Sequence, residues 1–178
     1  MVVEEEAIQK LSTTDWAVLA ALLEQRSHGF RIAALFASSG ELGDIWRIQR
    51  TQVYRALEHL QAEGLVEAVR QEEGEAGPPR TLFAATATGR ASALKWLRTP
   101  VTRLRYGRSD LRLKIAFLMR LGHNPKPLLL AQQKVYGQIL HELTAQHLGA
   151  EGVQAVSLLW RLEMAKASLR FIEQLLEK

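Results

Sequence analysis

The order of apolar and polar residues predicts a mainly helical chain that is interrupted once by a short β-hairpin. Apolar residues recur at the helical spacing of three and four in a segment opening at Ser12, in Phe30–Phe36 and in Ile48–Glu63. Two β-prone runs, Leu65–Arg70 and Thr81–Thr86, come next, and Thr86 is placed to cap a further helix. This helix should stop before Pro100, because the residue preceding proline is disfavoured in helical geometry.

The stretch around residues 49–63 is expected to be a helix with one apolar and one polar face. The apolar positions are Val53, Ala56, Leu57 and Leu60, and the leading polar positions are Gln49, Arg50, Gln52 and Arg55. Arginine can bind guanine and glutamine can bind adenine through two hydrogen bonds, so these side chains suit base edges and phosphates. Gly64 should end the helix at positive φ. An ordinary solvated helix face is the alternative, because Arg and Gln are also good helix formers.

Residues on both sides of this helix are expected to build the rest of a small domain. Ser12 and Asp15 can cap the first helix, and Trp16 is expected in the core. His28 is interpreted as a turn or cap histidine without a metal role. Trp46 and Ile48 are expected to anchor the start of the 49–63 helix, with Arg47 facing outward near the position of a phosphate.

The hairpin is expected to form a wing with an exposed turn over residues 72–80. The turn is acidic at Glu72, Glu73 and Glu75, which phosphates would repel. Only Arg70 and Arg80 are candidate backbone contacts, so we expect little affinity from the wing, or contact through Arg80 alone. A helix with a polar leading end, a glycine stop and an immediate hairpin is typical of a winged helix-turn-helix.

The C-terminal part is expected to consist of two long helices, over residues 128–148 and 152–177. The last helix carries two apolar stripes at helical spacing. One is Leu158, Leu162, Ala165, Leu169, Ile172 and Leu176; the other is Val153, Val156, Trp160, Met164, Ala167, Phe171 and Leu175. One stripe can pack on the preceding helix, and the other then needs a cover, since large exposed apolar patches are rare on monomers. A second copy of the chain is the simplest cover.

A basic segment, residues 99–120, precedes these helices. Arg112, Lys114 and Arg120 are interpreted as a solvated face, while Arg103, Arg105 and Arg108 could add flanking phosphate contacts. The distribution of charge along the chain weakens an argument for DNA binding from the net charge alone. Residues 1–100 hold 11 Lys and Arg against 13 Asp and Glu, whereas residues 101–178 hold 12 against 6. The positions of individual charged residues must therefore decide whether the chain binds DNA.

Composition excludes several classes of function. The chain of 178 residues has no cysteine, which excludes disulfides and thiolate catalysis and fits a cytoplasmic location. No apolar run reaches about 18 residues, and the acidic start does not resemble a secretory signal. No nucleotide-binding, hydrolase or zinc-protease motif is present, and His141 and His147 lack metal-ligand spacing. We therefore expect neither an enzyme nor a bound metal or cofactor.

Four stretches, in this order and spacing, resemble the PadR family of bacterial transcriptional regulators. They are Ser12–Ala20 with His28–Phe30; Gln52–Leu57 with Glu63–Val66; Thr86–Ala91; and Thr99–Arg103 running into Leu113–Phe117. Many family members carry Ser-x-Gly-Thr-Leu-Tyr-Pro-Ala-Leu where this chain has residues 49–57. Tyr54, Ala56 and Leu57 match this motif, whereas the residues at the outward-facing positions differ from it. The resemblance therefore implies a similar scaffold, but it does not imply the operator sequence that other family members recognise.

Together, these observations predict a mainly α fold with two domains. Residues 1–99 would form a winged helix-turn-helix DNA-binding domain, with three helices, a hairpin wing and a following helix, and residues 100–178 a helical dimerisation domain. The candidate DNA contacts are Arg47, Gln49, Arg50, Thr51, Gln52, Tyr54, Arg55 and Arg80; the role of Tyr54, a backbone contact through its hydroxyl, is implied by the resemblance. The candidate dimer contacts are Val156, Leu158, Trp160, Leu162, Met164, Leu169, Phe171, Ile172, Leu175 and Leu176.

The expected function is a homodimeric repressor that binds an inverted-repeat operator in double-stranded DNA. The resemblance also implies release by a small-molecule inducer bound between the winged domain and the C-terminal helices. Trp96 and Trp160 are candidates to line such a pocket, with core packing as the alternative role. A winged-helix adaptor that dimerises and binds protein instead of DNA is the alternative function.

Overall fold

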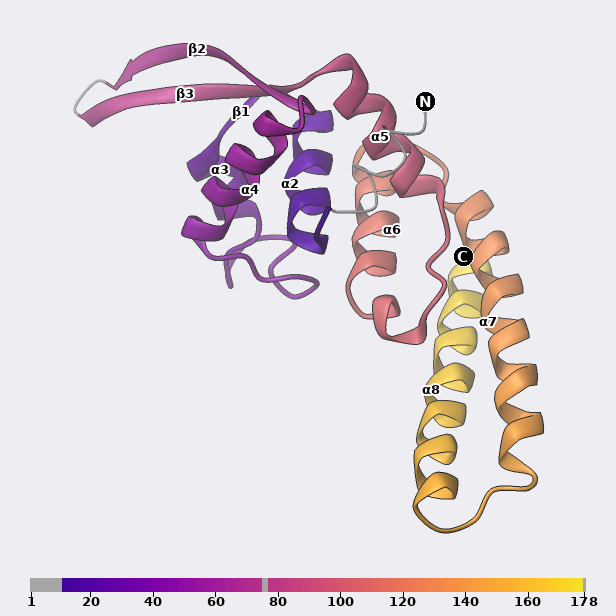
Figure 1. Cartoon of the computed structure of the whole chain (residues 1–178). Helices are drawn as coiled ribbons and strands as arrows, with labels where there is room; N and C mark the ends of the chain where they lie inside the picture. Colours follow the sequence, from indigo (N-terminus) through magenta and orange to yellow (C-terminus); the bar gives the residue numbers. More distant parts are fainter. Residues whose placement is uncertain (1–10, 75–76, 178) are drawn as a thin grey trace. The chain divides into compact units, whose positions relative to one another are not determined.

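The computed structural model describes residues 11–74 and 77–177, and the chain folds into two compact units (Figure 1). The winged unit comprises residues 1–97 together with 113–123, and the C-terminal unit comprises residues 98–112 together with 124–178. The division near residue 98 lies beside the boundary expected at residue 99, but residues 113–123 belong with the winged unit. The first ten residues and Glu75 of the expected acidic wing lie outside the described residues.

The winged unit begins with a helix that is capped as the sequence predicts. Helix α2 spans Thr13–Glu24. The Asp15 N–H donates to Ser12 Oγ at 3.1 Å, and the Ser12 N–H donates back to Asp15 Oδ2 at 2.9 Å. This reciprocal pair satisfies backbone donors that a helix start leaves open. Helix α3, Gly29–Leu35, follows after a short break.

Helix α4, Arg50–Ala62, is the amphipathic helix expected around residues 49–63. Its four predicted apolar positions are all buried. Ile48 is buried immediately before the helix, and the Trp46 indole N–H donates to Thr14 Oγ1 at 3.3 Å. Gly64 ends the helix with φ of 68°, the left-handed conformation that glycine adopts without strain. The predicted start, stop and buried face are therefore confirmed.

The wing is longer than the sequence suggests. Strands β2, Val66–Gly74, and β3, Gly77–Ala85, pair antiparallel, and Glu72 lies opposite Arg80 in the ladder. The expectation of an open turn over residues 72–80 is wrong, because backbone pairing continues through this polar stretch. The two-residue strand β1, Ser27–His28, pairs with β3 and completes a sheet of order β1-β3-β2. In Figure 1, β2 and β3 extend together well past the helices of this unit.

Helix α5, Ala87–Arg98, is capped at Thr86 as expected: the Gly89 N–H donates to Thr86 Oγ1 at 3.0 Å. Helix α6 spans Asp110–Arg120, and its residues from Leu113 onward belong to the winged unit. There, the Phe117 ring centroid lies 6.3 Å from that of Phe36. These buried rings place the second half of α6 in the core of the winged unit.

Of the basic residues of α6 expected on a solvated face, Lys114 is buried, whereas Arg120 is exposed but ion-paired. The Lys114 side chain is buried with its Nζ 4.9 Å from the centroid of the Trp96 ring. Arg120 donates to both carboxylate oxygens of Glu24, at 2.6 and 2.8 Å, and also pairs with Glu41. These partners lie far away in the sequence, so periodicity alone could not place the two cations. Both have structural contacts within the winged unit.

The C-terminal unit is built on a pair of long helices, α7, Lys126–His147, and α8, Gly152–Leu176. Figure 1 shows them side by side, joined by the loop expected around residues 149–152. Their core contains Leu143, Leu158, Leu162 and Ala165, with Leu104 of the short 3-10 helix η1, Leu104–Gly107, packed against it. Buried Gln132 exchanges two hydrogen bonds with the backbone of Val101, at 2.7 and 2.9 Å, and fixes the segment before η1 on α7. Within the described residues, no helix is both long and apolar enough to span a membrane.

Candidate nucleic-acid interface

The leading edge of α4 is exposed along its whole length. Gln49, Arg50, Thr51, Gln52 and Arg55 all face solvent, and exposed Arg47 precedes them. None of the three arginines forms an ion pair with a carboxylate in the part of the chain that the structure describes. The edge therefore presents neutral amide groups and charged guanidinium groups. No described carboxylate of the winged unit neutralises these guanidinium groups by direct pairing.

Gln52 has a second role that the sequence reasoning missed. Its side-chain Oε1 accepts the backbone N–H of Gln49 at 2.9 Å, so Gln52 caps α4 from the third position of the helix. The spacing of Gln49 and Gln52 already carried this signal, because a capping residue reaches back three positions. With the oxygen engaged, the amide NH₂ remains as the group that can donate to a base or a phosphate.

Tyr54 connects α4 to the rest of the winged unit. It is half-buried, and its ring lies against Gly29 at the start of α3: a Cβ at residue 29 would be 2.7 Å from Tyr54 Cε1. The Arg50 guanidinium lies 5.7 Å from the Tyr54 ring centroid. The sequence alternative of an aromatic holding the helix to the domain describes this packing. A backbone contact through the hydroxyl stays a prediction.

The wing is fastened to the domain by His28. Its Nδ1 lies 3.0 Å from the carbonyl oxygen of Thr81, and its Nε2 lies 3.0 Å from Glu72 Oε2. His28 occupies the position before α3, but its side chain makes no capping bond. The interpretation as a cap histidine holds for its position as the N-cap of α3 but missed the role of its side chain, which ties β2 and β3 to β1. The pairing partners are 44 and 53 residues away and were invisible in the local sequence.

The two candidate arginines of the wing differ in their surroundings. Arg70 donates to Glu72 Oε1 through Nε at 2.8 Å and through Nη2 at 2.6 Å. The hydrogen bond from Arg70, its positive charge and the contact with His28 hold the pKa of Glu72 below its ordinary value. Arg80 is exposed and lies 4.9 Å from the Phe30 ring centroid. Of the two, Arg80 is the guanidinium without a carboxylate partner among the described residues.

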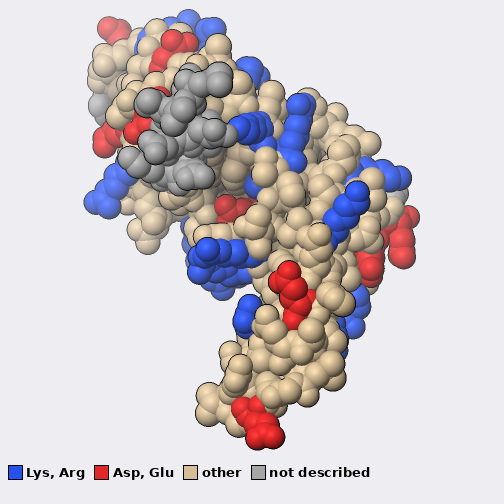
Figure 2. All heavy atoms as spheres, turned by 45° about the vertical axis from the view of Figure 1, so that its right-hand side comes forward, with Lys and Arg blue, Asp and Glu red and all other residues tan. Residues whose placement is uncertain are grey.

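Charge on the face drawn in Figure 2 does not mark a DNA-binding surface. Figure 2 shows acidic and basic side chains interspersed over the face in view, apart from one compact group of Lys and Arg. The net charge of +4 is likewise modest. Recognition of DNA would therefore depend on the particular side chains at the α4 edge.

The two apolar stripes of α8 have different environments. Leu158, Leu162 and Ile172 are buried, whereas Leu169, Leu175 and Leu176 are half-buried. In contrast, Val156 is 71% exposed and Trp160 is 69% exposed, and Met164 and Phe171 are also exposed. The candidate dimer residues thus separate into an inner stripe that packs within the chain and an outer stripe that the described residues leave uncovered.

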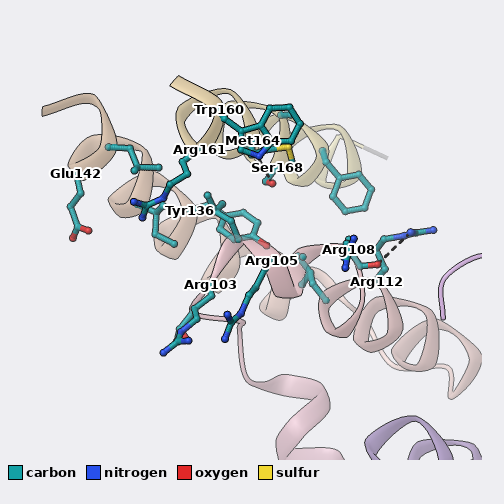
Figure 3. Close-up of a pocket in the computed structure, with 18 of the residues that line it drawn as sticks. Arg103, Arg105, Arg108, Arg112, Tyr136, Glu142, Trp160, Arg161, Met164 and Ser168 are labelled. Carbon is teal, nitrogen blue, oxygen red and sulfur yellow. Dashed lines mark hydrogen bonds between the residues drawn. The ribbon is translucent and has the colours of Figure 1, made fainter. Parts of the chain in front are cut away.

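The two tryptophans expected at an inducer pocket do not share one site. Trp96 stacks on Trp16 in the winged unit, with ring centroids 5.4 Å apart. Trp160 instead lines a cavity of about 920 Å³ that is contained within the C-terminal unit (Figure 3). The same cavity is lined by Tyr136 and by Arg103, Arg105, Arg108, Arg112 and Arg161. No grouping of three or more potential metal ligands occurs in residues 11–74 and 77–177.

Comparison with known proteins finds a family that matches most of the winged unit. Residues 18–95 match the family described as "Transcriptional regulator PadR-like family". A Mycobacterium tuberculosis protein named "Probable transcriptional regulator Rv1176c" is 30% identical over 94 residues, 53% of this chain and 48% of that protein. The chain thus spans about half the length of this curated relative.

Solved structures show more remote likeness. Bacillus subtilis PadR in complex with operator DNA has a TM-score of 0.47 at 20% identity, covering 92% of this chain and 96% of that one. The same Bacillus protein in complex with p-coumaric acid has a TM-score of 0.39 at 19% identity, covering 92% and 93%. These likenesses are too remote to place individual residues. The winged part of this chain is thus similar, over residues 18–95, to the PadR-like family of transcriptional regulators.

Proposed function

We propose that this protein is a sequence-specific DNA-binding transcriptional regulator that inserts α4 into the major groove. The observation that carries the proposal is the exposed, unneutralised edge of α4. A helix of this kind presents its N-terminal residues to base edges in winged helix-turn-helix proteins. Arg50 and Gln52 are the proposed base contacts, and Arg47, Thr51 and Arg55 the proposed phosphate contacts. Gln49 and Tyr54 complete the edge, and Arg80 of the wing adds a flanking contact.

The active form is proposed to be a homodimer joined through the outer stripe of α8. Exposed Val156, Trp160, Met164 and Phe171 form an apolar surface of the kind that oligomeric proteins cover. Dimerisation also solves a problem of specificity, because a base contact discriminates by only about 1–3 kcal/mol. Two copies of α4 on an inverted repeat double these contacts, with half-sites about 34–36 Å or a multiple of that apart.

The family resemblance supports repression that is relieved by a small-molecule inducer, in a cytoplasmic protein without catalytic activity. In the geometry proposed, a dimer bound over a promoter would exclude polymerase and so repress transcription. Relief requires that the inducer bind the DNA-free form more tightly than the bound form.

The test is selection of bound fragments from the parent genome, followed by gel-shift titration at several salt concentrations. Affinity should fall steeply with salt, because phosphate contacts release counterions. Arg50→Ala should weaken specific binding by about 10-fold or more, since a bidentate base contact contributes about 1–3 kcal/mol. Gln61→Ala, an exposed substitution near the other end of the same helix, is the matched control and should leave affinity unchanged.

A second variant separates capping from base contact. Gln52→Glu keeps an oxygen that can accept the Gln49 N–H, so thermal stability should be retained. It also places a negative charge at the DNA surface, so binding should be lost. Unchanged operator binding by Arg50→Ala and Gln52→Glu would refute the assignment of α4. Absence of any shift at low salt would favour an adaptor that binds protein.

A further inference from the structure

The wing arginine that has no carboxylate partner among the described residues lies on an aromatic ring of α3. The Arg80 guanidinium carbon is 4.9 Å from the centroid of the half-buried Phe30 ring. Phe30 in turn stacks on the His28 ring, with the centroids 5.6 Å apart and the planes inclined by 12°. A guanidinium within about 6 Å of a ring centroid is attracted by the electrons of the ring face. The position of Arg80 is therefore defined by a contact that involves no negative charge.

The carboxylate best placed to neutralise Arg80 is engaged by other residues. Glu72 lies directly opposite Arg80 in the β2–β3 ladder, where opposite charges can pair across the strands. One oxygen of Glu72 instead accepts from Arg70, through Nε at 2.8 Å and Nη2 at 2.6 Å. The other oxygen lies 3.0 Å from His28 Nε2. Both oxygens thus have partners, and Arg80 keeps its positive charge beside an acidic residue.

A contact with a ring face leaves the hydrogen-bonding groups of Arg80 available. A guanidinium has five N–H donors, and its attraction to an aromatic face requires none of them. Phe30 therefore restricts the side chain without using a donor. A phosphate oxygen can accept these donors in the bidentate geometry that arginine favours. Because an arginine loses much rotational freedom when it binds, a guanidinium that is already positioned is less costly to order.

From these contacts we infer that Phe30 is a positioning residue, which holds the Arg80 guanidinium in place for a DNA phosphate beside the half-site. The inference deepens the proposed function and rests on it, because Arg80 is the flanking contact proposed for the wing. Arg70 and His28 contribute indirectly, since they hold the Glu72 carboxylate away from Arg80. An acidic wing thus contacts DNA through one arginine whose charge is free and whose position is fixed.

A double-mutant cycle at residues 30 and 80 tests the inference, with affinity for the selected genomic fragment measured by fluorescence anisotropy at several salt concentrations. Arg80→Gln should weaken binding by about 10-fold, because a charge-assisted hydrogen bond is lost. It should also lower the slope of log affinity against log salt by about 0.9, the contribution of one phosphate contact. Phe30→Leu should weaken binding by about 3-fold in the natural chain, because Arg80 is no longer ordered, and should have no further effect in the Arg80→Gln background. Phe30→Tyr, which keeps a ring face, should bind as the natural chain does.

Phe83→Leu is the matched control, because it removes a ring of β3 over which no described cation lies. Residues 80 and 83 are separated by an odd number of positions in one strand, so their side chains point to opposite faces. Any loss of affinity from Phe83→Leu should therefore be the same in the natural chain and in the Arg80→Gln background.

A measurement on the natural chain requires neither a variant nor DNA. The ring current of Phe30 should shift the NMR signals of the Arg80 δ-methylene protons upfield, since these protons are bonded next to the guanidinium that lies over the ring.

Equal losses from Phe30→Leu with and without Arg80→Gln would overturn the inference, because the ring would then act on the fold alone. Unchanged affinity in Phe30→Leu, or Arg80 protons without the upfield shift, would overturn it as well. These outcomes leave operator binding by the natural chain intact, so they count against the inference and not against the proposed function. A natural chain that binds no fragment even at low salt would refute the proposed function, and the inference with it.

Discussion

Helices α2 and α8 are both rich in apolar residues, yet they lie in opposite environments. In α2, every residue from Asp15 to Leu23 is buried by the winged unit. In α8, only Leu158, Leu162, Ala165 and Ile172 of 25 residues are buried, and the outer stripe faces solvent. The difference indicates that α2 completes its packing within its own unit, whereas the described residues leave an apolar surface of α8 uncovered.

The largest loss of stability is expected from a substitution at a completely buried residue. Leu19→Ala in α2 should lower the free energy of unfolding by about 2–5 kcal/mol, because it removes buried methyl groups and leaves a cavity. Leu148→Ala makes the same chemical change at a residue that is 85% exposed, and should change stability by less than about 1 kcal/mol. Urea unfolding monitored by circular dichroism measures both. Equal losses would mean that exposure in this structure does not distinguish core from surface.

The outer stripe of α8 should matter for assembly more than for folding of one chain. Trp160→Ser should weaken dimerisation by about 2 kcal/mol or more, roughly 30-fold, if Trp160 is an interface anchor. Sedimentation velocity over a concentration series would show the shift toward monomer. Gln174→Ser, at an exposed polar position of α8, is the control and should leave the dimer intact. A dimer that persists in Trp160→Ser would place the interface elsewhere.

Much of the winged unit could be predicted because its signals are local. The Ser12 cap, the buried face of α4, the Gly64 stop and the Thr86 cap each depend on residues a few positions apart. Contacts between residues that lie far apart in the sequence were not predicted. His28 reaches β3 and Glu72, while Lys114 lies on Trp96, and nothing in the nearby sequence specifies these partners.

The C-terminal unit shows the same division between local and distant information. The two helices and both stripes of α8 followed from periodicity, but which stripe packs inward depends on α7. The arginines of residues 103–108 were seen as a basic run, whereas the cavity they border requires Tyr136 and Trp160 from two other helices. Charge was thus visible in the sequence, and its convergence on one site was not.

A smaller loss of stability is expected from a substitution at the contact between α3 and α4. Gly29→Ala would place a Cβ 2.7 Å from Tyr54 Cε1, so the ring must move. Overpacking of this kind costs roughly 1–3 kcal/mol, and the shift of α4 should also weaken operator binding. Pairing the substitution with Tyr54→Leu should restore stability, because the smaller side chain removes the collision. If Gly29→Ala alone changes neither melting temperature nor gel shift, Tyr54 does not position α4.

The smallest effect is expected at the wing and depends on pH. The His28 ring contacts two acceptors of the wing, the Thr81 carbonyl and the Glu72 carboxylate. Because Arg70 and His28 lower the pKa of Glu72, the ionised carboxylate is favoured in the folded wing. The resulting stabilisation is present above the ordinary glutamate pKa and is lost as pH falls through the lowered value. Amide exchange at Thr81 and Leu82 should therefore accelerate, relative to the intrinsic rate, as the pH falls below the ordinary glutamate pKa. Glu72→Gln should show the fast exchange at pH 6 already, while Glu73→Gln, at an exposed neighbour, should keep the slow exchange. Identical pH profiles for these two variants would show that the wing is held by its backbone ladder alone, and that His28 contributes to the sheet only through β1.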